Sequence, residues 1–257
     1  MDDTFSAEML QAQLRDIPGP LVIDVRGDAA YAAAREAVPR AIRRDPDRVA
    51  DWALELEIGR RIVAYCEDGR ASSRAAEALR DRGLPAAHLD GGIAGWTAHG
   101  FPTAAKPVVP TLWVTRERPK VDRIACPWLI RRFIDPDARF LYVPAAQVQV
   151  VAGQTGAIPF DVPEVKFGHA GVQCSFDAFI RHYQLHDPAL DRLAEIVRGA
   201  DTGHPDLTAQ SSGLLALSGG LSAIFDDDQR QLRHGLVLYD ALYAWCRTQT
   251  ATKASVV

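Results

Sequence analysis

Cys66 lies where an apolar stretch of the chain gives way to small and polar residues. It follows the run Arg61–Tyr65 and precedes the loop residues Glu67, Asp68, Gly69, Arg70, Ala71 and Ser72. The backbone N–H groups of such a loop, and the N-terminus of the helix expected after it, stabilise a sulfur anion or a bound oxyanion. Because the thiolate is the reactive form of cysteine, this pattern predicts a site for sulfur chemistry.

The loop residues modify this prediction in two directions. Gly69 permits a tight turn, and Arg70 can pair with an anionic sulfur donor such as a thiosulfonate. Glu67 and Asp68 bring negative charge close to the cysteine, which opposes thiolate formation and repels anionic donors. We therefore expect a persulfide or a protein-bound sulfur to be a better donor than thiosulfate. The alternative is that Cys66 is a small core residue at a strand end.

Two other groups of residues have side chains that could bind ligands. The first could hold a tetrahedral oxyanion such as sulfate, and comprises Arg116, Lys120 and Arg123. Its alternative is a solvated basic face. The second has the donor types of a transition-metal site, and comprises His169, Cys174 and Asp201. Its spacing matches no standard zinc pattern, so a structural role for these residues is the alternative.

The elements that must position Cys66 alternate between strands and helices. Short apolar runs predict buried strands at Leu21–Asp24, Arg61–Cys66 and Ala86–Leu89. Helical segments are expected between and after them, at about 29–37, 47–56, 72–82 and 92–98. This alternation predicts an α/β domain at residues 1–105, with a parallel sheet and flanking helices.

The chain changes character after a proline-containing stretch. Residues 106–111, with Pro107 and Pro110, are predicted to form a linker. Strands are then expected at Leu112–Thr115 and Phe140–Val143, with a helix at Arg123–Ile134 between them. Later helices are indicated by Asp187-Pro188 and by an apolar stripe made of Leu232, Leu236, Tyr239, Tyr243 and Cys246. Residues 112–257 therefore predict a second, mainly helical α+β domain.

Composition limits the classes of function. The 257 residues carry a formal net charge of −4, so binding to nucleic acid is not expected. No apolar run approaches the ~20 residues that span a bilayer, so neither a membrane span nor a membrane partner is expected. The N-terminus lacks the pattern of a secretory signal, and the four cysteines form no C-x-x-C pair. These features favour a reducing compartment, and we expect the cytoplasm.

The first domain resembles the rhodanese family. The resemblance is carried by three segments, LVIDVR (21–26), VAYCEDGRAS (63–72) and LDGGIAGWTAHGFP (89–102). It implies a sulfurtransferase that forms a persulfide on Cys66 and needs no cofactor, with a small sulfur donor and a thiol acceptor as partners. Asp24 and Arg26 match a pair that braces the active-site loop in this family. Many members have an arginine where this chain has Ala71, which leaves Arg70 as a substitute.

The second domain resembles the C-terminal domain of the chromate-resistance regulator family. The segments that carry this resemblance include those at 113–144, 158–179, 192–202 and 239–247. It implies an association with chromate resistance. Together with the residue types described above, this makes chromate a candidate ligand for the basic cluster and a metal ion a candidate cofactor of this domain. A repressor role does not transfer, because the regulators bind DNA through a different N-terminal region.

Two hypotheses about function follow from these observations. The first is a sulfurtransferase fused to a chromate-resistance module and acting through a Cys66 persulfide. The second is a sensor or accessory protein that binds chromate or a metal, in which the rhodanese domain is not catalytic. The sequence identifies neither the sulfur donor nor the oligomeric state.

Overall fold

The computed structural model of the chain describes residues 3–106 and 111–254. The chain divides into two compact units, Met1–Val109 and Pro110–Val257. The boundary falls inside the predicted linker at 106–111, and Pro107 and Pro110 lie outside the described residues. Each unit is described separately below.

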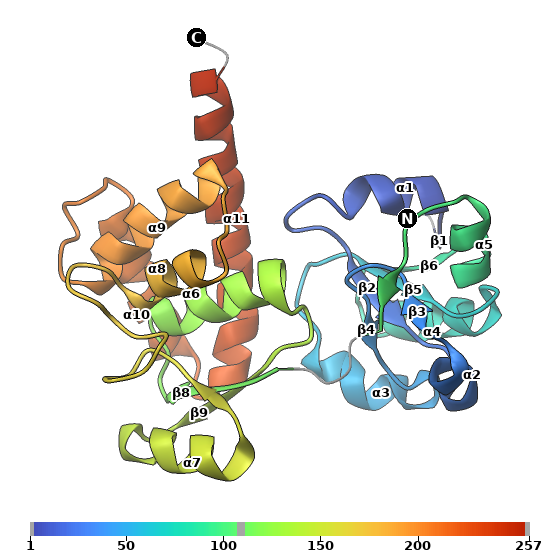
Figure 1. The fold of residues 1–257 in the computed structure, drawn as a ribbon, viewed down its shortest axis with the longest axis horizontal. Coiled ribbons are helices and arrows are strands. Elements are labelled where there is room, and N and C mark those ends of the chain that lie inside the picture. The colour runs from blue at the N-terminus through green and yellow to red at the C-terminus, as the bar shows by residue number, and fades with distance from the viewer. Residues whose placement is uncertain (1–2, 107–110, 255–257) are drawn as a thin grey trace. The chain divides into compact units, whose positions relative to one another are not determined.

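The first unit is built on a five-stranded parallel sheet with the strand order β1-β6-β5-β2-β4 (Figure 1). The strands are β1 (Thr4–Phe5), β2 (Leu21–Asp24), β4 (Ile42–Arg43), β5 (Ile62–Tyr65) and β6 (Ala86–Leu89). The three strands predicted from apolar runs are confirmed. The edge strands β1 and β4 have two residues each, too few to produce a recognisable sequence pattern. A separate antiparallel pair joins β3 (Glu36–Ala37) to β7 (Ala104–Ala105).

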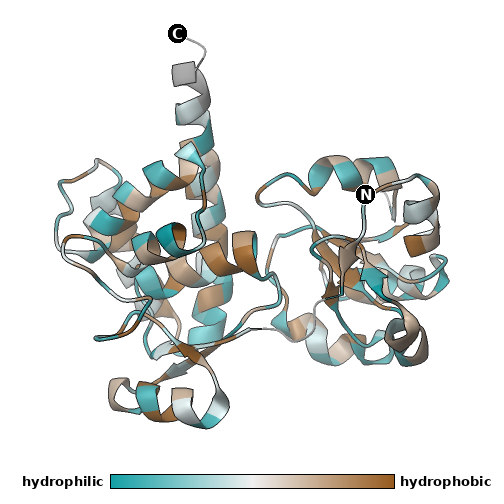
Figure 2. Cartoon of the chain, in the orientation of Figure 1, coloured by the Kyte–Doolittle hydropathy of each residue, from teal (hydrophilic) through white to brown (hydrophobic). Residues whose placement is uncertain are grey.

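The helices of the first unit cover both faces of its sheet, as predicted. They are α1 (Ala7–Gln13), α2 (Asp28–Ala33), η1 (Pro46–Arg48), α3 (Val49–Trp52), η2 (Ala53–Glu55), α4 (Arg70–Arg80) and α5 (Gly92–Ala98). Successive residues of a strand face opposite sides, so Ile62, Ala64 and Cys66 pack in one buried cluster. Val63 and Tyr65 belong to the cluster on the other face. The apolar residues of these strands are brown in Figure 2.

The second unit contains a three-stranded parallel sheet and is otherwise largely helical. The sheet order is β10-β8-β9, with β8 (Leu112–Arg116), β9 (Arg139–Val143) and β10 (Ile158–Pro159). The helices are α6 (Asp122–Leu129), a π-helical turn η3 (Ile130–Ile134), η4 (Ala145–Gln147), α7 (Val148–Thr155), α8 (Ser175–His182), α9 (Pro188–Asp201), α10 (Ser211–Ile224) and α11 (Asp228–Ala254). The fold class expected from the sequence is therefore confirmed for both units.

The apolar stripe predicted near the C-terminus forms the buried side of α11. Its five residues, Leu232, Leu236, Tyr239, Tyr243 and Cys246, are each at most 3% exposed. α11 packs against α6 and α9, and the ring of Trp128 on α6 contacts both tyrosines of the stripe. Among the described residues, no helix is both long enough and apolar enough to cross a membrane.

Candidate functional site

Cys66 lies directly after the carboxyl end of β5, at the start of the turn that leads into α4. β5 lies in the middle of the sheet, between β6 and β2, and these neighbouring strands fix the position of its end. The side chain is 3% exposed and shares a cluster with Ala75 and Ala76 of α4. The strand and the helix that follows it thus hold the sulfur in one place.

Ser72, in the first turn of α4, contacts the sulfur with two groups. Its backbone N–H donates to Cys66 Sγ at 3.4 Å, and its hydroxyl oxygen lies 3.5 Å from the same atom. The hydroxyl also lies 3.1 Å from the carbonyl oxygen of Gly69, so its single proton can be donated either to that carbonyl or to the sulfur. The first turn of a helix carries a partial positive charge, so these contacts favour negative charge on the sulfur. Of the backbone N–H groups expected to point at the sulfur, that of Ser72 does so.

The first turn of α5 holds the loop from the other side. The backbone N–H of Ile93 donates to the carbonyl oxygen of Cys66 at 2.9 Å, and that of Ala94 to the carbonyl of Glu67 at 3.1 Å. This close approach requires a glycine at position 92, where a Cβ would lie 2.5 Å from the Cys66 carbonyl oxygen. Gly92 therefore allows α5 to approach the loop closely enough to hold it.

Asp68 lies beside the sulfur and forms an ion pair with Arg70. Asp68 Oδ1 is 3.8 Å from Cys66 Sγ, and the Asp68 carboxylate pairs with the Arg70 guanidinium at 2.5 Å. Hydrogen bonds from Arg70 lower the pKa of Asp68, which keeps the carboxylate charged. An anionic donor must therefore compete with Asp68 for the Arg70 guanidinium. Glu67 is exposed, and Ala71 is the second residue of α4, directly after Arg70.

Asp24 and Arg26 brace the strand that carries the cysteine. They are 1% and 3% exposed, and the Arg26 guanidinium donates to both carboxylate oxygens of Asp24 at 2.6 to 3.0 Å. The hydroxyl of Tyr65, the residue before Cys66, donates to Asp24 Oδ2 at 2.8 Å. Arg26 also donates to the carbonyl of Glu36 in β3. The pair therefore ties β2, β3 and the end of β5 together.

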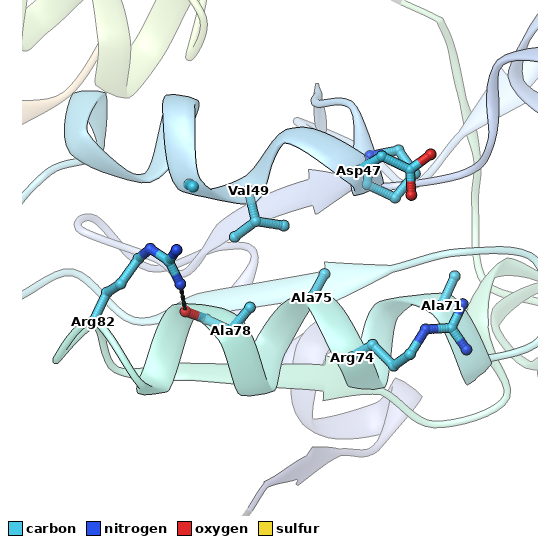
Figure 3. A pocket seen from close by; sticks show the side chains of 9 residues that line it. Asp47, Val49, Ala71, Arg74, Ala75, Ala78 and Arg82 are labelled. Atoms are coloured by element: carbon cyan, nitrogen blue, oxygen red, sulfur yellow. Dashed lines mark hydrogen bonds between the residues drawn. The ribbon is translucent and has the colours of Figure 1, made fainter.

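A pocket of about 380 Å³ lies between η1, α3 and α4 in the same unit (Figure 3). Ala71, Arg74 and Arg82 contribute to its α4 side, and Val49 to the opposite side. Cys66 is not among the residues that line it. The pocket therefore adjoins the helix that follows the loop, and does not contain the sulfur.

In the second unit, the basic residues predicted to bind an oxyanion face a carboxylate. Arg116 and Arg123 pair with Asp161 at 3.1 and 3.3 Å, whereas Lys120 is exposed. Asp161 is 4% exposed, and its pKa is lowered although its burial acts in the opposite direction. Hydrogen bonds from His169 and Ser175 cause this shift, together with the two guanidinium groups. Arg116 and Arg123 are thus already paired inside the protein.

The predicted metal ligands are only partly brought together. His169 Nε2 lies 3.0 Å from a carboxylate oxygen of Asp201, as a shared site requires. Cys174 is not among the residues whose donor atoms come together. It lies buried at the N-terminus of α8, where its backbone N–H donates to the Asp177 carboxylate. Burial raises the pKa of the Cys174 thiol, which disfavours the thiolate that metals bind. The structure replaces it with Asp122 and Asp161.

The resulting cluster contains Asp122, Asp161, His169 and Asp201, whose donor atoms lie within 4.8 Å of one another. The pKa of His169 is raised to about 9. A hydrogen bond with Asp161 is the main cause, and its effect is larger than the opposing effect of burial. Burial raises the pKa of Asp122 and of Asp201, and neighbouring carboxylates add to both shifts. The sequence alone did not identify Asp122 and Asp161 as ligands. The feature that could have indicated them is their position, because each follows a strand of the same parallel sheet.

Comparisons with known proteins agree with this division of the chain. Residues 6–99 match the sequence model of the rhodanese-like domain, and residues 113–246 match that of the ChrB C-terminal domain. The second match covers just over half of the chain. The chain belongs to the ChrB C-terminal domain family. It carries a rhodanese-like domain in front of the ChrB-type unit.

A curated relative supports the family assignment. Protein ChrB of Cupriavidus metallidurans is 36% identical over 132 residues, which make up 51% of this chain and 39% of that protein. The match therefore spans well under half the length of the relative.

Solved structures similar to this chain include several rhodanese-like proteins. One from Anabaena sp. is 28% identical, with 41% of this chain and 81% of that chain covered and a TM-score of 0.37. One from Thermoplasma volcanium is 23% identical, with 41% and 100% covered and a TM-score of 0.37. One from Staphylococcus aureus is 21% identical, with 41% and 100% covered and a TM-score of 0.36.

Proposed function

We propose that the rhodanese-like unit is a sulfurtransferase that carries sulfur on Cys66. The observation that carries the proposal is the pair of contacts from Ser72 to the sulfur, a backbone N–H at 3.4 Å and a hydroxyl at 3.5 Å. Donors directed at a cysteine from the start of a helix favour the thiolate and would equally support a terminal persulfide sulfur. No cofactor is required for this chemistry.

The reaction has two displacement steps. The Cys66 thiolate attacks the outer sulfur of the donor, an S–S bond forms, and the donor's remaining group leaves with the electron pair of the broken bond. With thiosulfate this leaving group is sulfite, and with a persulfide it is a thiolate. An acceptor thiolate or cyanide then attacks the outer sulfur of the persulfide, which returns Cys66 to its thiolate form.

The charges around the loop favour some donors over others. Asp68 places negative charge 3.8 Å from the sulfur and holds Arg70 in an ion pair. A dianion such as thiosulfate meets this negative charge while Arg70 is already paired with Asp68. Persulfides and polysulfides of lower charge are therefore the proposed donors, with a thiol as the acceptor.

The ChrB-type unit supplies the proposed biological setting, which is chromate resistance. Chromate is an oxyanion shaped like sulfate, and its reduction consumes thiols. A cell exposed to it needs sulfur transfer for repair, which gives a reason to fuse the two units. A cytoplasmic setting is part of this proposal, because the four free cysteines suit a reducing compartment.

A second candidate function is supported by the burial of the cysteine. Cys66 is 3% exposed and has a carboxylate nearby, which would suit a rhodanese fold that no longer turns over substrate. The protein would then be a sensor or accessory protein that binds chromate or a metal through its second unit.

Steady-state assays distinguish the two candidates. The full chain and Cys66→Ser are assayed with thiosulfate, mercaptopyruvate and polysulfide as donors, and with cyanide or a thiol as acceptor. The proposal expects turnover that is fastest with polysulfide and absent in Cys66→Ser. An inactive wild-type chain that still binds chromate or a metal by calorimetry would favour the second candidate.

A further inference from the structure

Four ligand-type side chains from separate parts of the ChrB-type unit meet at one point. Asp122 begins α6, Asp161 follows β10, Asp201 ends α9, and His169 comes from the connection between β10 and α8. His169 Nε2 lies 3.0 Å from Asp201, 3.2 Å from Asp161 and 3.7 Å from Asp122, measured to a carboxylate oxygen in each case. The fold thus gathers three carboxylates and one imidazole that are distant in the sequence.

The separation of these atoms matches that of the ligands of a small metal ion. Donors about 2.1 Å from a common ion lie roughly 3.0 Å apart in an octahedral site and roughly 3.4 Å apart in a tetrahedral one. The three distances from His169 Nε2 run from 3.0 to 3.7 Å, and the whole set lies within 4.8 Å. An ion can therefore be placed among them with little side-chain movement.

An unpartnered oxygen is the second, independent observation that points to a ligand. Asp122 is fully buried, and its Oδ2 accepts the backbone N–H groups of Ser175 and Phe176 at the start of α8. Among the described residues, its Oδ1, which is also buried, has no nitrogen or oxygen donor, although the Cys174 thiol interacts with this carboxylate. A buried carboxylate oxygen without a partner is costly, and coordination to a cation removes that cost.

We propose that Asp122, Asp161, His169 and Asp201 bind a divalent first-row transition metal, with manganese(II) or iron(II) as the preferred class. Three carboxylates and one imidazole form a mainly oxygen donor set, and the thiolates that select zinc in structural sites are missing from the group. Arg116 and Arg123 contact Asp161 from outside the group and orient it.

The three carboxylates of the cluster are largely shielded from solvent, whereas the histidine is partly exposed. The side chains of Asp122, Asp161 and Asp201 are 0%, 4% and 16% exposed, whereas that of His169 is 43% exposed. A bound ion would therefore be reached past His169, and water or an anion could complete its coordination. The proposal is independent of Cys66, because every ligand comes from the other unit.

The competing account is a metal-free ion-pair network. In that account, a protonated His169 and two arginines balance the three carboxylates, and the cluster only connects α6, α9 and the loop after β10. Both accounts predict some loss of stability when a carboxylate is changed. Only the metal site predicts a stoichiometric ion whose affinity depends on these residues.

The test measures Mn²⁺ binding to the full chain after treatment with a chelator. Titration followed by electron paramagnetic resonance and calorimetry gives the stoichiometry and Kd, and elemental analysis of the purified protein gives the metal bound during expression. The variants are His169→Ala, which changes a half-exposed side chain, and Asp201→Asn. The matched controls are His186→Ala and Asp191→Asn, which change exposed residues of the same unit, and Cys66→Ser in the other unit.

The proposal expects one Mn²⁺ per wild-type chain and per control chain, with Kd raised at least about tenfold in both cluster variants. It also expects added Mn²⁺ to raise the Tm of the wild-type chain, with a much smaller effect on His169→Ala. Absence of binding to the wild-type chain would overturn the proposal. Equal binding to wild type and to both cluster variants, with all chains folded by circular dichroism, would also overturn it.

Discussion

At the scale of single residues, the chemistry of the rhodanese-like unit depends on a balance around Cys66. Ser72 directs a backbone N–H and a hydroxyl at the sulfur, and both favour negative charge there. The Asp68 carboxylate, 3.8 Å from the sulfur, disfavours negative charge there and forms an ion pair with Arg70. The proposed preference for donors of lower charge depends on the balance between these two effects.

Replacing Asp68 tests this balance. Asp68→Asn removes a negative charge beside the sulfur and releases Arg70 from its ion pair, so we expect several-fold faster turnover with thiosulfate. Alkylation of Cys66 by iodoacetamide at neutral pH should also become faster. Asp81→Asn, an exposed change just beyond the other end of α4, serves as the control. A slower reaction with both reagents in Asp68→Asn would show that the carboxylate assists the cysteine.

At the scale of elements, the loop that holds Cys66 is positioned by α5 as much as by its own residues. The N–H groups of Ile93 and Ala94 bind the carbonyl oxygens of Cys66 and Glu67. Any side chain at position 92 would collide with this backbone. The role of Gly92 is therefore steric.

Gly92→Ala is expected to slow sulfur loading about tenfold or more, because a Cβ 2.5 Å from the Cys66 carbonyl oxygen must displace the loop. Gly83→Ala is the matched control, since Gly83 also has a positive φ of 77° but nothing within 4 Å of an added Cβ. The control separates backbone strain from the collision. Equal sulfur loading by the two variants, measured by mass spectrometry over time, would contradict the steric account.

In the ChrB-type unit, the packing of α11 against α6 and η3 includes a buried ion pair. Arg132 is 1% exposed and pairs with Asp240 at 2.8 Å, and Asp240 also accepts the indole N–H of Trp128. Asp240→Ala would leave a buried guanidinium without its carboxylate, so we expect a loss of about 3–5 kcal/mol in the free energy of unfolding. Asp226→Ala, an exposed change, should cost less than about 0.5 kcal/mol. Urea denaturation measures both values, and equal costs would contradict this role of the pair.

The elements show which parts of the fold can be predicted from sequence. Apolar runs such as Leu21–Asp24 and periodic patterns such as the stripe of α11 predict their elements correctly. The reason is that a buried strand or helix face requires apolar residues at a fixed spacing within the segment itself. The helix expected at Arg123–Ile134 begins at Asp122 and ends in a π-helical turn, η3. Two-residue strands such as β1 depend on pairing with a distant strand, here β6, and leave no local pattern.

The candidate sites differ in the same way. The Cys66 loop could be predicted because its cysteine, turn glycine and helix start are contiguous in the sequence. The carboxylate–histidine cluster could be predicted only in part, through His169 and Asp201, because its members come from separate elements of the second unit. Cys174 has the residue type of a metal ligand, but it lies buried at the N-terminus of α8 and outside the cluster.

At the scale of the whole molecule, the chain consists of two compact units, each with a candidate site made only of its own residues. This separation predicts independent behaviour. His169→Ala should leave sulfur loading on Cys66 unchanged, and Cys66→Ser should leave Mn²⁺ binding unchanged. Measuring both properties in both variants checks this. Loss of both properties in either variant would show that the two sites are coupled.

The central claim of this account is that Cys66 accepts and carries sulfur. The measurement that tests it most directly is the intact mass of the full chain after incubation with polysulfide, thiosulfate or mercaptopyruvate. We expect a gain of one sulfur atom per chain, which is removed by a thiol reductant and does not occur in Cys66→Ser. An unchanged mass with all three donors, or the same gain in Cys66→Ser, would contradict the claim.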